Sequence, residues 1–222
     1  MARTLEVSFN ASGAAEAGAR GRVVVVVDVV DAATSAAAAL AAGAAHVLGA
    51  GTSRVEVPVP FHPDGIGARA AGLARGMGTS VVVAAEPRVG SDEERVATAK
   101  PVLTALEDAG VEYEVVPNQG AELPGLAKIE DKVVVVVSAT GGTTYDAAVA
   151  AGAPAVCFAT TARIQGKTGW EVAEAGARQA ISLADEHGAD ITVVAASSNS
   201  ADDCLAAFQI ARIIIADGFL KL

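Results

Sequence analysis

Two runs of five consecutive valines constrain the fold of this chain more than any other feature. They occupy Val23–Val27 and Val133–Val137, and similar apolar runs cover Val81–Ala85 and Ile191–Ala195. Continuous apolar runs, unlike alternating ones, are typical of strands in a parallel sheet that is covered on both faces. The sequence therefore predicts four buried strands at these positions.

Shorter apolar segments predict further strands, and alanine-rich segments between the strands predict helices. The additional strands are expected at residues 5–9, 47–49, 55–59, 113–116 and 155–158. The helices are expected at residues 35–42, 67–76, 92–109, 145–151, 169–187 and 201–217. This alternation predicts an α/β fold, a three-layer α/β/α sandwich with a largely parallel or mixed sheet.

The length of 222 residues suits one α/β domain with a substantial core. Residues 23–44, VVVVVDVVDAATSAAAALAAGA, resemble residues 133–153, VVVVVSATGGTTYDAAVAAGA. This similarity suggests an internal repeat, with halves at 1–116 and 117–222. Because valine and alanine are so frequent in this chain, coincidence is the alternative explanation.

The charge balance excludes several classes of partner. With 16 Lys and Arg against 26 Asp and Glu, the net charge is −10. An acidic domain matches neither a phosphate backbone nor an anionic membrane surface, so we expect no nucleic-acid or membrane partner.

Other sequence features predict where the chain is located and how it assembles. We find no secretory signal pattern and no uncharged stretch apolar enough to cross a bilayer. Cys157 and Cys204 are 47 residues apart, which fits reduced thiols in a cytoplasmic protein. The mean hydropathy of +0.42 and the alanine-rich helices lead us to expect a homodimer.

Polar residues that follow the predicted strands are the candidates for chemistry, because ligands of open α/β sheets bind beyond the carboxyl ends of the strands. Asp28 follows the first valine run, where a carboxylate needs a metal ion, a helix N-terminus or a positive side chain. Asp31, Thr34 and Ser35 lie near the start of the next helix, where capping is the alternative role. Glu86 follows the third buried strand in the same way.

The turn at residues 138–144, SATGGTT, leads from the second valine run into a helix. Its N–H groups and hydroxyls would cradle a phosphate or sulfonate, and a tight βα turn is the alternative. The candidate residues of this turn are Thr140, Gly141, Gly142, Thr143 and Thr144.

Two further charged segments contain candidates. Asp202 and Asp203 open the last predicted helix, where they complement the helix dipole or, in the case of Asp203, bind Mg²⁺. The segment around Lys167 ends like a phosphate loop, but Thr161 stands where that motif requires glycine. Lys167 is therefore a candidate only as a point charge for an anion.

Residues 23–50 resemble the opening motif of the ComB family, the 2-phosphosulfolactate phosphatases: a valine-rich strand, an Asp, a short Thr/Ser turn and an alanine-rich helix ending in Gly-Ala. Weaker resemblances follow in order at residues 84–90, 117–122, 131–153 and 200–214. The resemblance implies an α/β/α fold and Mg²⁺-dependent hydrolysis of a phosphate monoester, 2-phospho-3-sulfolactate, on the route to coenzyme M. By motif position it places these residues in or near the site: Asp28, Thr34, Glu86, Asn118, Thr140, Gly142, Thr143 and Asp203.

The chain departs from the family pattern where the family has arginines. Asp31 stands in place of the first-turn Arg, and Pro87 displaces another, although Arg88 follows. An anionic substrate normally requires guanidinium groups. Either Arg88, Arg163 or Lys167 substitutes for them, or the substrate differs, or catalysis has been lost.

The sequence thus leads to three functional hypotheses. The first is a Mg²⁺-dependent phosphatase acting on a small anionic phosphate monoester. Its catalytic residues would be Asp28, Asp31 and Glu86, its metal ligands Asp28 and Asp203, and its substrate-binding residues Thr34, Ser35, Asn118, Thr140, Gly141, Gly142, Thr143, Thr144 and Lys167. Whether Asp28 attacks phosphorus or activates water through the metal stays open. The second is a non-catalytic ComB-like protein that binds a small ligand or a partner, and the third is an enzyme of another class acting on a nucleotide or sugar phosphate.

Overall fold

The computed structural model describes residues 3–220 and confirms the α/β fold. The strands form two four-stranded parallel sheets, whereas the valine runs alone did not show that there would be two. Sheet A has the order β1-β8-β2-β7, and sheet B has the order β3-β6-β4-β5. The strands are β1 (Leu5–Phe9), β2 (Val23–Val27), β3 (His46–Ala50), β4 (Val81–Ala85), β5 (Tyr113–Pro117), β6 (Val133–Val137), β7 (Val156–Ala159) and β8 (Ile191–Ala195).

The strand order shows how the two halves of the chain are combined. Strands β1–β4 come from the first half and β5–β8 from the second, and the two sets alternate across both sheets. Each strand pairing of the described residues therefore joins the first half to the second. The valine strands β2 and β6 occupy equivalent inner positions, as an internal repeat would place them. The elements divide just before β5, a few residues earlier than the expected boundary at 116.

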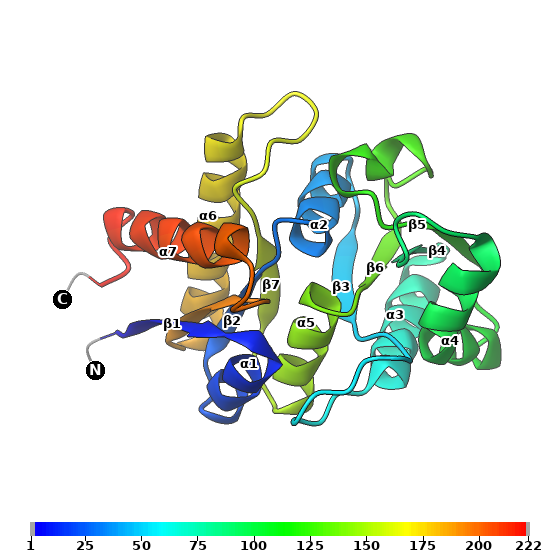
Figure 1. Cartoon of the computed structure of the whole chain (residues 1–222), viewed down its shortest axis with the longest axis horizontal. Coiled ribbons are helices and arrows are strands. Elements are labelled where there is room, and N and C mark those ends of the chain that lie inside the picture. Colours follow the sequence, from blue (N-terminus) through cyan, green and yellow to red (C-terminus); the bar gives the residue numbers. More distant parts are fainter. Residues whose placement is uncertain (1–2, 221–222) are drawn as a thin grey trace.

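Helices cover both faces of each sheet, as Figure 1 shows. The helices are α1 (Asn10–Ala19), α2 (Ala32–Ala41), α3 (Pro63–Met77), α4 (Asp92–Asp108), the short 3₁₀ helix η1 (Gly120–Gly125), α5 (Gly141–Ala150), α6 (Gly169–His187) and α7 (Ala201–Ala216). Sheet A lies between the pair α6 and α7 and the pair α1 and α5. Sheet B has α3 and α4 on its outer face, while α2, with η1 packed on it, lies on the inner face. Each sheet is thus the middle layer of an α/β/α sandwich.

The valines of β2 show why the buried strands lack polar alternation. Val24 and Val26 belong to the large core that also contains the strands of sheet B. Val23, Val25 and Val27 point to the opposite face, where they pack with α6 and α7. Because successive side chains of a strand point to opposite faces, a strand buried on both sides must be apolar throughout.

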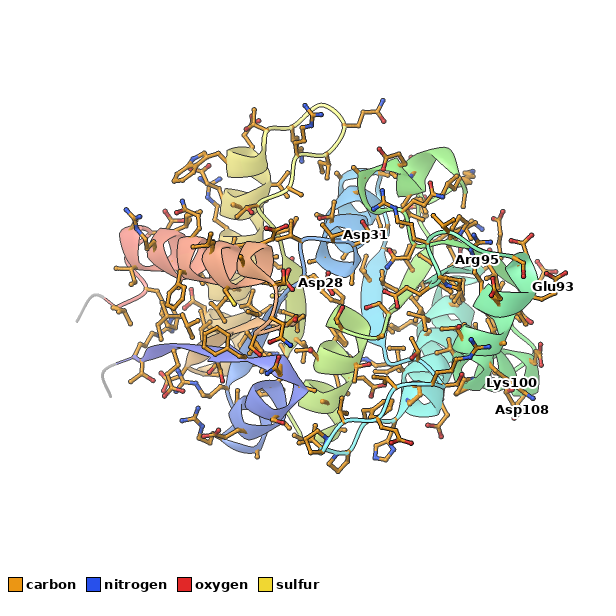
Figure 2. All side chains as sticks on the ribbon, viewed as in Figure 1. Asp28, Asp31, Glu93, Arg95, Lys100 and Asp108 are labelled. Atoms are coloured by element: carbon orange, nitrogen blue, oxygen red, sulfur yellow. The ribbon has the colours of Figure 1, made fainter. Side chains whose placement is uncertain are left out.

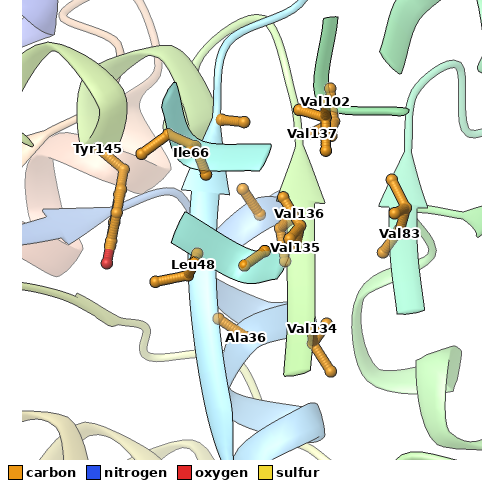
Figure 3. Packing of buried hydrophobic residues seen from close by; sticks show 14 of the residues in the cluster. Ala36, Leu48, Ile66, Val83, Val102, Val134, Val135, Val136, Val137 and Tyr145 are labelled. Carbon is orange, nitrogen blue, oxygen red and sulfur yellow. The ribbon is translucent and has the colours of Figure 1, made fainter. Parts of the chain in front are cut away.

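The same core holds the two sheets together as one unit. Figure 3 shows β6 valines packed with Leu48 of β3, Ile66 of α3 and Val83 of β4. Tyr145 of α5 belongs to this core and stacks on Phe158 of β7, with the ring centroids 5.0 Å apart. The core therefore passes from sheet B through α5 to sheet A.

Two sequence predictions need correction. Residues 55–59 form no strand and lie in a loop between β3 and α3. The alternation of valine there is interrupted by Pro58 and followed by Pro60, which have no N–H to give to a neighbouring strand. Helix α1 was not predicted; Gly13 and Gly18 interrupt its alanine-rich pattern and weaken the helical signal. Within residues 3–220, we find no helix that combines the length and apolarity needed to cross a membrane.

Candidate active site

Asp28 lies where the two halves of the chain meet. It directly follows β2, and the residue is 1% exposed. The Ala32 N–H of α2 donates to Asp28 Oδ1 at 3.3 Å. On the other side, Thr140 Oγ1 and the Gly141 N–H each donate to Asp28 Oδ2 at 2.7 Å. One carboxyl group thus joins the N-termini of α2 and α5, which are favourable places for negative charge.

Three more carboxyl groups surround Asp28: Asp31, Glu86 and Asp203. Burial raises the pKa of each, and the negative charge of Asp28 raises each of them further. Burial also raises the pKa of Asp28, against the lowering effect of its three hydrogen bonds. The structure therefore brings all four acidic candidates of the sequence into one cluster, which we call the acidic cluster.

Glu86 and Asp203 are held by backbone donors at equivalent positions of the two halves. The Ala139 N–H donates to Glu86 Oε2 at 2.9 Å, and the Val29 N–H donates to Asp203 Oδ1 at 2.8 Å. Burial, with a smaller contribution from Asp28, raises the pKa of Asp203 to about 6. A carboxyl group with this pKa exchanges protons close to neutral pH, as acid–base groups of active sites do.

Asp31 pairs with a cation from a neighbouring loop. Arg88 Nη1 donates to Asp31 Oδ1 at 3.2 Å and to Oδ2 at 3.3 Å. The Asp31 side chain is 14% exposed, whereas that of Arg88 is 51% exposed. Arg88 lowers the pKa of Asp31, but burial outweighs this effect and the net shift is upward. Figure 2 shows Asp28 and Asp31 in the region between the two sheets.

Arg95 of α4 holds the loop that carries Arg88, a role that the sequence analysis missed. Its side chain is 8% exposed, and its Nε donates to the Pro87 carbonyl at 3.0 Å. Its Nη2 donates to the carbonyls of Arg88 at 3.4 Å and of Gly90 at 2.9 Å. In the sequence this arginine lies in the charged segment DEER, which resembles an ordinary exposed helix start.

The turn at residues 138–144 already uses several of the donors that were proposed for an anion. Its N–H groups bind Glu86 through Ala139, Asp28 through Gly141, and Ser138 Oγ through Gly142 at 2.8 Å. The chain's own carboxylates thus take the place that a phosphate would take at this helix N-terminus.

Ser35 and Asn118 contact each other near the acidic cluster. The Ser35 hydroxyl donates to Asn118 Oδ1 and accepts the Gly120 N–H at 2.8 Å. The Asn118 residue is fully buried, and its Nδ2 has no hydrogen-bond partner within residues 3–220. These contacts join α2 to η1 behind Asp31.

The remaining substrate-binding candidates have other neighbours. Thr34 Oγ1 donates to the Val29 carbonyl at 2.7 Å, and Thr143 Oγ1 donates to the Ser138 carbonyl at 3.2 Å. Thr144 is buried at 1% exposure. Lys167 lines a separate cavity of about 130 Å³ between α2, β7 and α6.

Asp146 of α5 is a second residue that the sequence analysis missed. Its Oδ2 accepts the Gly51 N–H at 3.2 Å and its Oδ1 accepts the His62 N–H at 2.7 Å. It therefore ties both ends of the loop between β3 and α3. Burial raises its pKa to about 6. A single charge within an alanine-rich helix was the signal that would have pointed to it.

The donor set of the acidic cluster can be compared with the needs of Mg²⁺. Within residues 3–220, three or more His, Cys, Asp or Glu side chains do not come together as a ready-made metal site. Mg²⁺ requires only one or two carboxylates, with water and substrate oxygens completing its shell. The side chains around Asp28 offer oxygen donors, which is the chemistry that Mg²⁺ prefers.

No protein-family model matches this chain, and a comparison with curated proteins gave no significant match. The resemblance to the ComB family therefore stays a prediction that rests on the motifs quoted above.

Proposed function

We propose that this protein is a Mg²⁺-dependent phosphatase of small anionic phosphate monoesters, with the acidic cluster as its active site. One observation carries the proposal: near the carboxyl ends of parallel strands, three carboxyl groups lie close enough to Asp28 for its charge to raise the pKa of each. So many carboxyl groups in one buried place destabilise one another unless a cation or protons compensate. Such perturbed clusters are typical of functional sites.

Three of the four residues of the acidic cluster have a defined role in this proposal. Asp28 and Asp203 would hold Mg²⁺, which polarises the phosphoryl group and activates water when it is bound. Asp28 is fixed by three hydrogen bonds, so its orientation is set before substrate arrives. Glu86, with its raised pKa, would exchange a proton with the attacking or leaving oxygen.

2-Phospho-3-sulfolactate is the substrate that the ComB resemblance suggests. The proposal is made for the phosphomonoester class, because no contact of the described residues selects this one compound. The occupied N–H groups of the turn at residues 138–144 favour the alternative, a non-catalytic protein that binds a ligand without turnover. The experiment below distinguishes the two.

The test is phosphate release from 2-phospho-3-sulfolactate and a panel of phosphomonoesters, measured with Mg²⁺ and with EDTA. We expect EDTA-sensitive release that Asp28→Asn lowers at least about 100-fold, as expected for loss of a group that holds the metal. Asp202→Asn is the matched control, because Asp202 is an exposed neighbour of Asp203 on the same helix. Absence of release from folded protein, or full activity of Asp28→Asn, would overturn the proposal.

A further inference from the structure

An anion that enters the acidic cluster meets an unfavourable environment. Asp28, Asp31, Glu86 and Asp203 all carry potential negative charge there. The N–H groups of Ala139, Gly141 and Gly142, which would otherwise attract an anion, already donate to the chain's own oxygens. A phosphoryl group therefore needs a positive side chain in addition to any metal ion.

Arg88 is the cation that directly contacts this cluster, through its ion pair with Asp31. Within residues 3–220, no other Lys or Arg forms an ion pair with any of the four carboxyl groups. The two other cations named from the sequence line different cavities: Arg163 lies beside η1, and Lys167 lies between α2 and α6.

The Arg88 guanidinium has free capacity for a ligand. Only its Nη1 makes hydrogen bonds to the described residues, and both of these go to Asp31 at 3.2 and 3.3 Å. This single-nitrogen contact is weaker than a two-nitrogen fork, and the Arg88 end of the pair is half exposed to solvent. The remaining nitrogens can form such a fork with two oxygens of a phosphate.

The loop that carries Arg88 is fixed before any ligand binds. Arg95 donates to three of its backbone carbonyls, at Pro87, Arg88 and Gly90. Ser91 then caps α4, with Glu94 completing a reciprocal pair of hydrogen bonds. Arg88 is therefore a half-exposed side chain on a supported backbone.

We propose that Arg88 is the anion-binding residue of the site, and that Asp31 is a competitor for the same guanidinium built into the chain. A phosphoryl group binds by taking Arg88 from Asp31, so affinity depends on the balance between the two. The identity of the anion as phosphate rests on the proposed function, whereas the competition rests on the Asp31–Arg88 contact itself.

The test is calorimetric titration of the whole protein with inorganic phosphate, in Mg²⁺ and in EDTA. Arg88→Gln should weaken phosphate binding at least about tenfold, because a charge-assisted hydrogen bond is lost. Asp31→Asn should strengthen binding about threefold or more, since it removes both a competitor and a repelling charge. Within residues 3–220, the Asp31 side chain makes no capping hydrogen bond, so this change leaves the start of α2 intact. Arg163→Gln is the control and should stay within about twofold of the native protein.

The outcomes separate this inference from the phosphatase proposal, because binding of phosphate needs no turnover. Phosphate binding that depends on Arg88 in a protein without hydrolysis would support the inference and overturn the phosphatase. Hydrolysis by the native protein, together with unchanged phosphate affinity in Arg88→Gln, would support the phosphatase proposal and overturn the inference about Arg88. The inference is also overturned if native protein binds no phosphate, if Asp31→Asn weakens binding, or if Arg163→Gln gives the larger loss.

Discussion

Replacing Asp203 with Asn should stabilise the protein at alkaline pH. The residue is 5% exposed, and its pKa rises from the ordinary value of 3.8 to about 6. The folded state therefore binds this proton more tightly than the unfolded state does. The stability that Asp203 contributes is highest below about pH 4, falls as pH rises towards 6, and stays low above that.

The size of the effect follows from the shift in pKa. A shift of about two units corresponds to about 3 kcal/mol of unfavourable free energy in the folded protein at pH 8. Asn removes the charge and keeps an oxygen that can accept the Val29 N–H. The gain is an upper limit, because the new NH₂ group replaces an acceptor oxygen.

Urea unfolding of native protein and Asp203→Asn in EDTA, at pH 5 and at pH 8, measures this difference without any contribution from a bound metal ion. The variant should gain up to about 3 kcal/mol at pH 8, or about 6–12 °C in Tm for a chain of this size. The gain should shrink at pH 5, and Asp202→Asn should show no such dependence. A variant that is less stable at pH 8, or whose gain is the same at both pH values, would refute the reasoning.

Three further substitutions test close packing and the support of the loop that carries Arg88. Gly142→Ala should destabilise the protein by about 2–3 kcal/mol in urea unfolding, because the new Cβ would lie 2.0 Å from the Ala50 carbonyl oxygen. Gly72→Ala, on a helix with open space around it, should instead stabilise by about 0.5–1 kcal/mol, and equal effects of the two would contradict this packing. Arg95→Met should cost about 2 kcal/mol and speed amide hydrogen exchange in the loop that carries Arg88, whose carbonyls lose their donor. Unchanged exchange in that loop would show that Arg95 does not support it.

The buried strands could be predicted because a valine run is a local signal of burial on both faces. The division into two sheets could not, because strand order depends on pairings between residues far apart in the chain. The proline-interrupted valines at residues 55–59 show the limit of the signal: their alternation matches a strand, but Pro58 cannot complete one.

The acidic members of the candidate site were predictable from one rule about where parallel strands end. That rule selected Asp28, Glu86 and Asp203 without knowledge of their partners. Arg95 and Asp146 act on backbone groups of loops, and such contacts depend on the path of those loops. The partners of the N–H groups in the turn at residues 138–144 could not be predicted either, since the sequence does not show which carboxylate reaches them.

The alternation of the two halves across both sheets has a consequence for synthesis on the ribosome. A nascent chain of the first half can form helices, but its strands have no partners until the second half emerges. Sheet A is the last to be completed, because β8, at residues 191–195, lies between β1 and β2 and is synthesised near the end of the chain. The valines of β2 therefore stay unpaired through most of translation, which is the period when an apolar strand is most prone to aggregate. We expect the growing chain to depend on a chaperone until its last strand enters the sheet.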